Sequence, residues 1–242
     1  MPEEAGDRVV PTVPVPGADG ADGADPGVAH LSLAEAAAVV GGYVWIERQL
    51  AAAVGAWATR LALPAVQVHL AAQSGRHGWH AELWAERLPR LDGLNVEALC
   101  RPPSPAVGEV IGALDPLRRE RVREPERGGP SRTDEPPEGG TGPGALPFLA
   151  GLYRVVLPRL VVSYQAHLRA ASPVSDGPVI RALRLVVADE LEDWHDGELL
   201  VQRLVRRPHD VDAAAGFQKQ LEAGLVRAGA HPGLTRLPDG VT

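Results

Sequence analysis

The chain has 242 residues, of which 45% are hydrophobic, and it carries a formal net charge of −7. This length suffices for one full-sized hydrophobic core, while 27 glycines and 23 prolines imply that a substantial part of the chain lies outside regular elements. The negative charge disfavours binding to nucleic acid by phosphate neutralisation, and the single cysteine, Cys100, excludes an intrachain disulfide and any multi-cysteine metal site.

Residues 1–30 have the composition of a disordered tail. The segment from Met1 to Asp7 is acidic and lacks the positive charge and following apolar run of a secretory signal. The stretch from Val13 to Pro26 repeats Gly-Ala-Asp units between prolines and can bury little apolar surface. Since no uninterrupted apolar run of about 18 residues follows either, we expect no membrane span.

Two helices are predicted next. Ser32 and Glu35 have the spacing in which each side chain satisfies a free backbone donor of the other, so a helix should begin there and continue to about Arg60. Pro64 suits the first turn of a second helix, which would extend to about Leu88. We expect these two helices to form an antiparallel pair.

The middle of the chain interrupts the helical pattern. A short helix is predicted from Pro105 to about Arg121, and the Pro, Gly, Arg and Glu residues at about 118–145 are typical of a flexible linker. Helical character returns near Pro147 and continues to about Ala171. Proline inside a helix removes a hydrogen bond and clashes with the preceding turn, so Pro158 should kink or divide this third helix.

The last third of the chain predicts two more helices. Pro178 suits the first turn of a fourth helix, which would run to about Arg207, and a fifth, shorter helix is expected from Asp212 to Ala228. Residues 231–242 have the composition of a C-terminal tail. The predicted fold is therefore all-α, with a single helical bundle domain over residues 31–230 that contains four main helices and an additional short one.

Polar residues interrupt the apolar stripes of the first two helices. Glu47 falls in the middle of the first stripe, which consists of Val40, Tyr43, Leu50, Ala51 and Val54. On the second helix His77 lies within the stripe, and Gln73 and His80 lie on its shoulders. A carboxylate buried on an apolar face needs a partner. We therefore predict that Glu47 shares a buried pocket with His77 or His80 between these two helices.

The fourth helix has a less distinct apolar face. The residues that centre this face are Ile180, Val187, Leu191, Trp194 and Val201. Glu192 and His195 are predicted to lie progressively toward its edge. Their Glu-x-x-His spacing is the one that, on an inward-facing helix, supplies a carboxylate and an imidazole to a pair of irons.

Together with Glu47, this motif makes the chain resemble the ferritin-like superfamily over residues 32–88 and 147–205. The resemblance implies a ferritin-like four-helix bundle and an oxidase, a hydroxylase or an iron store. The sequence departs from the family pattern on two helices. On the second helix the residue three before His80 is His77 rather than a glutamate.

The third helix departs further from the family pattern. No Asp or Glu occurs between Ala145 and Ala171, where the conspicuous polar residues are Tyr164, Gln165 and His167. A di-iron centre with four carboxylates and two histidines therefore cannot be assembled. The candidate metal ligands that remain are Glu47, His77, His80, Glu192 and His195.

Each candidate also has a simpler interpretation. Glu192 and His195 fit a solvated acidic helix face, and Glu47 fits a buried ion pair with His77 or an arginine. The two histidines of the second helix fit ordinary packing and hydrogen bonding.

Two functions follow. The first is a divergent ferritin-like protein with a binding or structural role and a vestigial metal site, without a cofactor; the alternative is a non-haem iron or manganese oxidase or hydroxylase with an atypical His/Glu centre. We expect a cytoplasmic protein whose partner is a small molecule, another protein or a second copy in a homodimer, with neither nucleic acid nor membrane involved. The catalytic residues and the question of whether the chain is an enzyme stay open.

Overall fold

The computed structural model describes residues 31–90, 92, 95–116, 144–227 and 232–237, and every element in these ranges is helical. The predicted tail over residues 1–30 and most of the linker at about 118–145 lie outside the described residues. In chain order the helices are α1 (Leu33–Ala58), α2 (Pro64–Ala85), α3 (Val96–Leu99), α4 (Pro105–Gly112), α6 (Ala145–Gly151), η2 (Leu152–Val156), α7 (Leu157–Ala170), α8 (Gly177–Leu204) and α9 (Pro208–Arg227). For the residues that the structure describes, the prediction of an all-α fold is confirmed.

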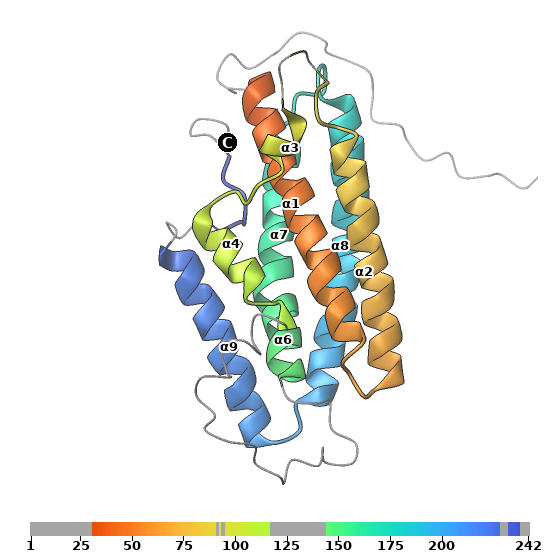
Figure 1. Ribbon diagram of the computed structural model, residues 1–242, viewed down its shortest axis with the longest axis vertical. Coiled ribbons are helices and arrows are strands. Elements are labelled where there is room, and N and C mark those ends of the chain that lie inside the picture. Colours follow the sequence, from red (N-terminus) through yellow and green to blue (C-terminus); the bar gives the residue numbers. More distant parts are fainter. Residues whose placement is uncertain (1–30, 91, 93–94, 117–143, 228–231, 238–242) are drawn as a thin grey trace, which may run out of the picture.

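The starts of the first two helices follow from local chemistry. Ser32 caps α1, since its side chain accepts from the backbone N–H of Glu35 and the Glu35 carboxylate accepts from the backbone N–H of Ser32, at 2.8 Å. Pro64 occupies the first turn of α2, where its missing N–H is not needed. The two helices pack against each other, and α2 also contacts α8 (Figure 1).

The helix formed by α6, η2 and α7 lies at the centre of the molecule. It contacts α8 and α9, and its largest buried side chains include Phe148 and Tyr153, which are wholly inaccessible. By length and hydropathy this Ala145–Ala170 helix could cross a membrane, but 72% of its most apolar window is buried inside the structure. A core helix passes the same test.

Pro158 does not end this helix. The turn that precedes it, Leu152–Val156, is a π-helix, and α7 continues beyond it to Ala170. The ring of a proline would clash with the carbonyl four residues earlier, here that of Arg154, which lies inside the π-turn. The wider π-turn, in which bonds join residues five apart, accommodates Pro158 without breaking the helix.

The remaining elements cover one side of the core. In Figure 1, α9 and α4 lie beside each other and flank the central helix, and the two are in contact. The predicted C-terminal tail has structure where it is described. Leu234 and Leu237 are buried, and the backbone N–H of Leu234 donates to Ser163 Oγ at 2.7 Å, so residues 232–237 pack against α7.

Candidate metal centre

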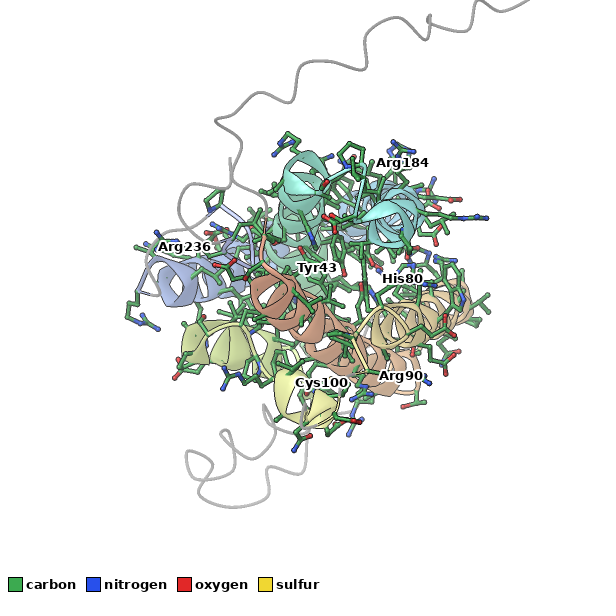
Figure 2. The ribbon with its side chains drawn as sticks, turned by 90° about the horizontal axis from the view of Figure 1, so that it is seen from above. Tyr43, His80, Arg90, Cys100, Arg184 and Arg236 are labelled. Atoms are coloured by element: carbon green, nitrogen blue, oxygen red, sulfur yellow. The ribbon has the colours of Figure 1, made fainter. Side chains whose placement is uncertain are left out.

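Four buried polar side chains converge between α1, α2 and α8. They are Glu47 from α1, His77 and His80 from α2, and Glu190 from α8, and all four are 0% exposed. One ligand atom from each lies within 4.8 Å of the others. The two histidines are three residues apart and therefore project from the same face of α2. Viewed along the bundle, His80 points from α2 toward the interior, where Tyr43 also lies (Figure 2).

The donor atoms of this cluster lie at short, similar separations. His77 Nδ1 is 2.6 Å from Glu47 Oε2 and 3.2 Å from Glu190 Oε1. His80 Nδ1 is 3.3 Å from Glu190 Oε1 and 3.6 Å from Glu47 Oε1. Only the first of these contacts is an aligned hydrogen bond. Within the described part of the chain, neither oxygen of Glu190 has a hydrogen-bond partner, although both are buried.

A carboxylate outside the cluster orients His80. Its Nε2 lies 3.1 Å from Oδ2 of Asp189, whose side chain is about one-third exposed. A carboxylate accepts, so Nε2 carries a ring proton, and in the neutral imidazole Nδ1 would present a lone pair to the cluster. This arrangement of carboxylate, imidazole and ligand position is typical of metal-binding histidines.

Tyr164 of α7 holds the other side of Glu47. Its hydroxyl donates to Glu47 Oε1, and the phenol is wholly buried. The Tyr164 ring stacks on Trp84 with the centroids 5.6 Å apart and meets Tyr43 edge-on at 4.7 Å. Glu47 is thereby fixed from two directions, by an imidazole and by a phenol, which leaves little freedom for its rotamer.

Polar contacts continue along the seam between α2 and α8. One turn from Glu190, the buried Asp193 accepts from Arg76 Nε at 2.9 Å, and a second guanidinium nitrogen completes a bidentate pair. Beyond it the hydroxyl of Tyr153 donates to Gln73 Oε1 at 2.7 Å. A side chain at Gly197 would overlap the Tyr153 ring, so α8 can approach the π-turn only with glycine at this position.

The charges of the cluster shift the pKa values of its members. Burial alone would lower the pKa of His77, but the carboxylates of Glu190 and Glu47 outweigh it and raise this pKa to about 10. The pKa of His80 is raised to about 11 by the same two carboxylates, again against burial. For Glu47, burial opposes the two imidazoles, which lower the pKa to about 2. With no metal bound, protonated imidazoles compensate the buried carboxylates.

The structure brings together three of the five predicted ligands. Glu47, His77 and His80 meet as expected, and the predicted pocket of Glu47 and His77 is confirmed. Glu192 and His195 are not part of the cluster, because both are exposed on the outer side of α8. The α8 side chain that joins Glu47, His77 and His80 is Glu190 rather than Glu192 or His195.

The error came from the phase of the apolar face of α8. Leu191, placed at the centre of that face, is 39% exposed, and the buried positions are shifted by about one residue. The residues on the buried face are Ala182, Leu183, Val186, Glu190, Asp193, Gly197 and Val201. Their spacing of three and four residues was readable in the sequence, but two acids and a glycine made this stripe look polar.

Comparisons with protein-family models, with curated proteins and with solved structures found no match to this chain. The functional assignment therefore rests on the geometry of the cluster.

Proposed function

We propose that this chain binds one divalent transition-metal ion, with Glu47, His77, His80 and Glu190 as the ligands. The observation that carries the proposal is the convergence of four fully buried donors from three helices, whose ligand atoms lie within 4.8 Å of one another. In tetrahedral coordination, ligand atoms that are each about 2.1 Å from the ion lie about 3.4 Å from one another. The three unaligned contacts of the cluster, at 3.2 to 3.6 Å, have this separation.

The buried polar atoms that lack hydrogen-bond partners favour a metal site over a cluster of ion pairs. Buried polar atoms without partners cost about 1–3 kcal/mol each, and more when charged, so native structures rarely keep them. Here both oxygens of Glu190 and Nδ1 of His80 are buried without an aligned hydrogen bond to the described residues. A cation at the centre of the cluster would satisfy all of these atoms together, whereas protons on the two imidazoles would satisfy them only in part.

The donor set fits one ion and does not fit the di-iron pair of ferritin-like proteins. A second ion would need further carboxylates, but Asp193 is engaged by Arg76 and the third helix offers the phenol of Tyr164. We therefore propose a divergent ferritin-like four-helix bundle built from α1, α2, the α6–α7 helix and α8, with a reduced centre for a single metal. Two imidazoles with two carboxylates suit zinc, iron or manganese.

A binding or structural role is the better supported one. Structural metal sites are closed by four protein ligands, whereas catalytic sites keep a position open for water or substrate. All four ligands here are inaccessible, and they come from three different helices. A metal in this position would join α1, α2 and α8 and so contribute to the stability of the bundle.

The test is the metal content of purified protein after incubation with zinc, iron(II) or manganese(II) and desalting. The proposal predicts about one ion per chain in the wild type and its loss in Glu190→Gln. The matched control is Glu192→Gln, which changes an exposed glutamate on the same helix and should keep the metal. Equal metal content in the two variants, or a metal-free wild type, would refute the proposal.

One observation favours a second candidate, an iron or manganese oxidase or hydroxylase. The buried phenol of Tyr164 donates directly to a ligand carboxylate and stacks on Trp84, which places two oxidisable aromatic rings beside the centre. The metal would supply the redox chemistry, and the residues would hold it and exclude water. Oxygen consumption by the iron(II)-loaded wild type that is absent in Glu190→Gln would favour this candidate. If the bound iron(II) instead stays reduced in air, the oxidase or hydroxylase candidate is excluded and the structural role is supported.

A further inference from the structure

A separate pocket lies in the seam between α2 and α8, beyond His80 and Asp189 toward the first turn of α8. Its volume is about 550 Å³, and its lining residues are Leu83, Arg87, Gly177, Pro178, Arg181, Ala182 and Leu185. Volumes of about 300–1,000 Å³ are typical of sites for small molecules. None of the four proposed metal ligands lines it, so its occupant would be distinct from the metal.

The charge of this pocket is opposite to that of the chain. Its lining contains two arginines and no acid, whereas the whole protein has a formal net charge of −7. Arg181 makes no ion pair or hydrogen bond with the described residues. Among the described residues, the guanidinium of Arg87 bonds to the neighbouring Glu86, at 3.3 Å, and its Nε is buried without a hydrogen-bond partner. Two guanidinium groups with free donors beside one cavity are suited to bind an anion.

The start of α8 adds the backbone N–H of Gly177 to the same place, whereas Pro178 has no N–H and the N–H of Ile180 donates to the carbonyl of Asp176. Gly177 and Pro178 open the helix, and the side chain of the preceding Asp176 makes no cap hydrogen bond to it. That carboxylate instead accepts from the backbone N–H of Ser172, at 2.8 Å. The start of a helix carries partial positive charge, so the first turn of α8, with the N–H of Gly177, reinforces the attraction of an anion.

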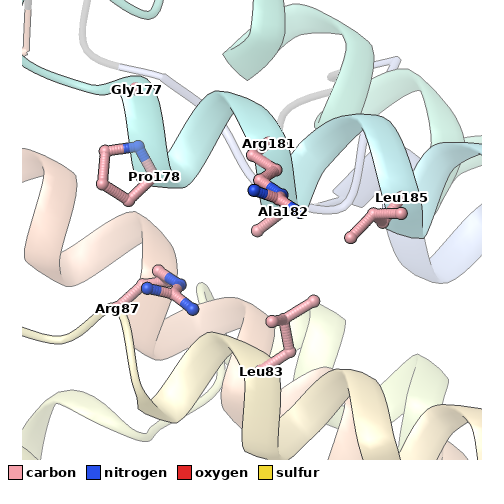
Figure 3. Close-up of a pocket in the computed structure, with 7 residues that line it drawn as sticks. All are labelled: Leu83, Arg87, Gly177, Pro178, Arg181, Ala182 and Leu185. Atoms are coloured by element: carbon pink, nitrogen blue, oxygen red, sulfur yellow. The ribbon is translucent and has the colours of Figure 1, made fainter.

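The other side of the pocket is apolar. Leu83 of α2 and Leu185 of α8 face each other across the gap, while Arg87, which follows the end of α2, reaches toward Pro178 and Arg181 (Figure 3). Leu185 is 45% exposed, whereas the next residue in the chain, Val186, is buried in the core. A ligand with an apolar part would cover this leucine, whereas a simple anion would leave it in water.

We propose that this pocket binds a small anionic amphiphile, in which a carboxylate or phosphate head is held by Arg87 and Arg181 and a short apolar chain lies between Leu83 and Leu185. Octanoate is a suitable probe. We expect one saturable site in isothermal titration calorimetry. Loss of one charged hydrogen bond should weaken binding roughly tenfold, both in Arg87→Gln and in Arg181→Gln.

The control variant is Arg184→Gln, which removes an exposed arginine of α8 that does not line the pocket, and it should bind octanoate as the wild type does. Octyl phosphate should compete with octanoate, whereas 1-octanol and inorganic phosphate should each bind at least roughly tenfold more weakly. Absence of saturable binding, an unchanged affinity in the Arg87→Gln/Arg181→Gln double variant, or equal binding of inorganic phosphate would overturn the proposal. Glu190→Gln should still bind octanoate. A failure of the octanoate proposal is therefore distinguishable from a failure of the metal proposal.

Discussion

At the scale of single residues, the centre depends on side chains that do not touch the proposed metal. Asp189 fixes the orientation of His80, and Tyr164 fixes that of Glu47. The hydrogen bond from His80 to Asp189 selects the tautomer of the imidazole, and the hydrogen bond from Tyr164 to Glu47 selects the rotamer of the carboxylate. The donor atoms are therefore directed at one point before any metal arrives.

Replacing Asp189 should weaken metal binding without removing a ligand. In Asp189→Ala, His80 loses the acceptor of its Nε2–H, and we expect the metal affinity to fall by about 10–100-fold. Competition against a fluorescent chelator measures this change. Asp196→Ala, at an exposed position one helical turn beyond Glu192, is the control and should bind as the wild type does. An affinity for Asp189→Ala equal to that of Asp196→Ala would show that this hydrogen bond does not support the site.

His167 gives a pH dependence that is separate from the metal centre. Burial lowers the pKa of this imidazole from 6.5 to about 4, against the weaker opposing charge of Asp176. Above pH 6.5 both the folded and the unfolded chain hold it neutral, so it contributes no pH dependence there. As the pH falls from 6.5 toward 4, this imidazole binds a proton in the unfolded chain but stays neutral in the folded chain. The free energy of unfolding therefore decreases by up to about 3 kcal/mol.

The variant His167→Leu should remove this dependence. Urea unfolding at several pH values between 7 and 4 measures the free energy of unfolding of both proteins, and the wild type should lose stability more steeply toward acid. Because the remaining titrating groups are common to both proteins, the difference between the two curves isolates His167. Parallel curves over this range would contradict the burial of a neutral imidazole.

At the scale of helices, the contact between α8 and the π-turn requires glycine. A Cβ at position 197 would overlap the ring of Tyr153, whereas one at Gly216 of α9 would meet no atom within 4 Å. We expect Gly197→Ala to lower the free energy of unfolding by about 1–3 kcal/mol through overpacking. Gly216→Ala should raise it by about 0.5–1 kcal/mol through helix propensity. Thermal or urea unfolding compares the two, and a neutral Gly197→Ala would contradict the close packing of α8 on η2.

Local signals predicted most of the helices. The capping pair of Ser32 and Glu35 and the prolines at positions 64 and 178 act within one turn, so their effect can be read without knowledge of the tertiary structure. The π-turn before Pro158 could not be predicted, because it depends on packing against other elements, and α3 is a single turn capped by Asn95 that is too short to give an apolar stripe. Pro158 indicated a distortion but not its kind.

The candidate site was only partly predictable for a related reason. Glu47 and His77 stood out because each interrupts a strongly apolar stripe. Glu190 did not, since its own face of α8 also contains Asp193 and Gly197 and is polar in composition. These acids are buried because histidines and Arg76 of α2 meet them, and such compensation between helices is invisible in one helix alone.

At the scale of the whole molecule, the proposed metal would link helices from distant parts of the sequence. Glu47 and Glu190 are separated by most of the bundle's sequence, yet both lie against the same histidines of α2. A ligand that binds only the folded chain stabilises it, by about 4 kcal/mol when its free concentration is a thousand times its dissociation constant. Metal binding and folding should therefore be coupled.

Chelation should make this coupling visible. We expect EDTA treatment to lower the Tm of the metal-loaded wild type by several degrees, and re-addition of the metal to restore it. Differential scanning calorimetry measures both steps. In Glu190→Gln the same treatment should have no effect, because no metal is bound. A wild-type Tm that does not respond to chelator or metal would show that the cluster stabilises the bundle by ion pairing alone.

The most direct test of the central claim is a crystal structure of the metal-loaded protein with data collected at the absorption edge of the metal. We predict one anomalous peak per chain, within about 2.3 Å of donor atoms of Glu47, His77, His80 and Glu190. A peak elsewhere, or four ligands that pair with one another around an empty centre at saturating metal, would contradict the account.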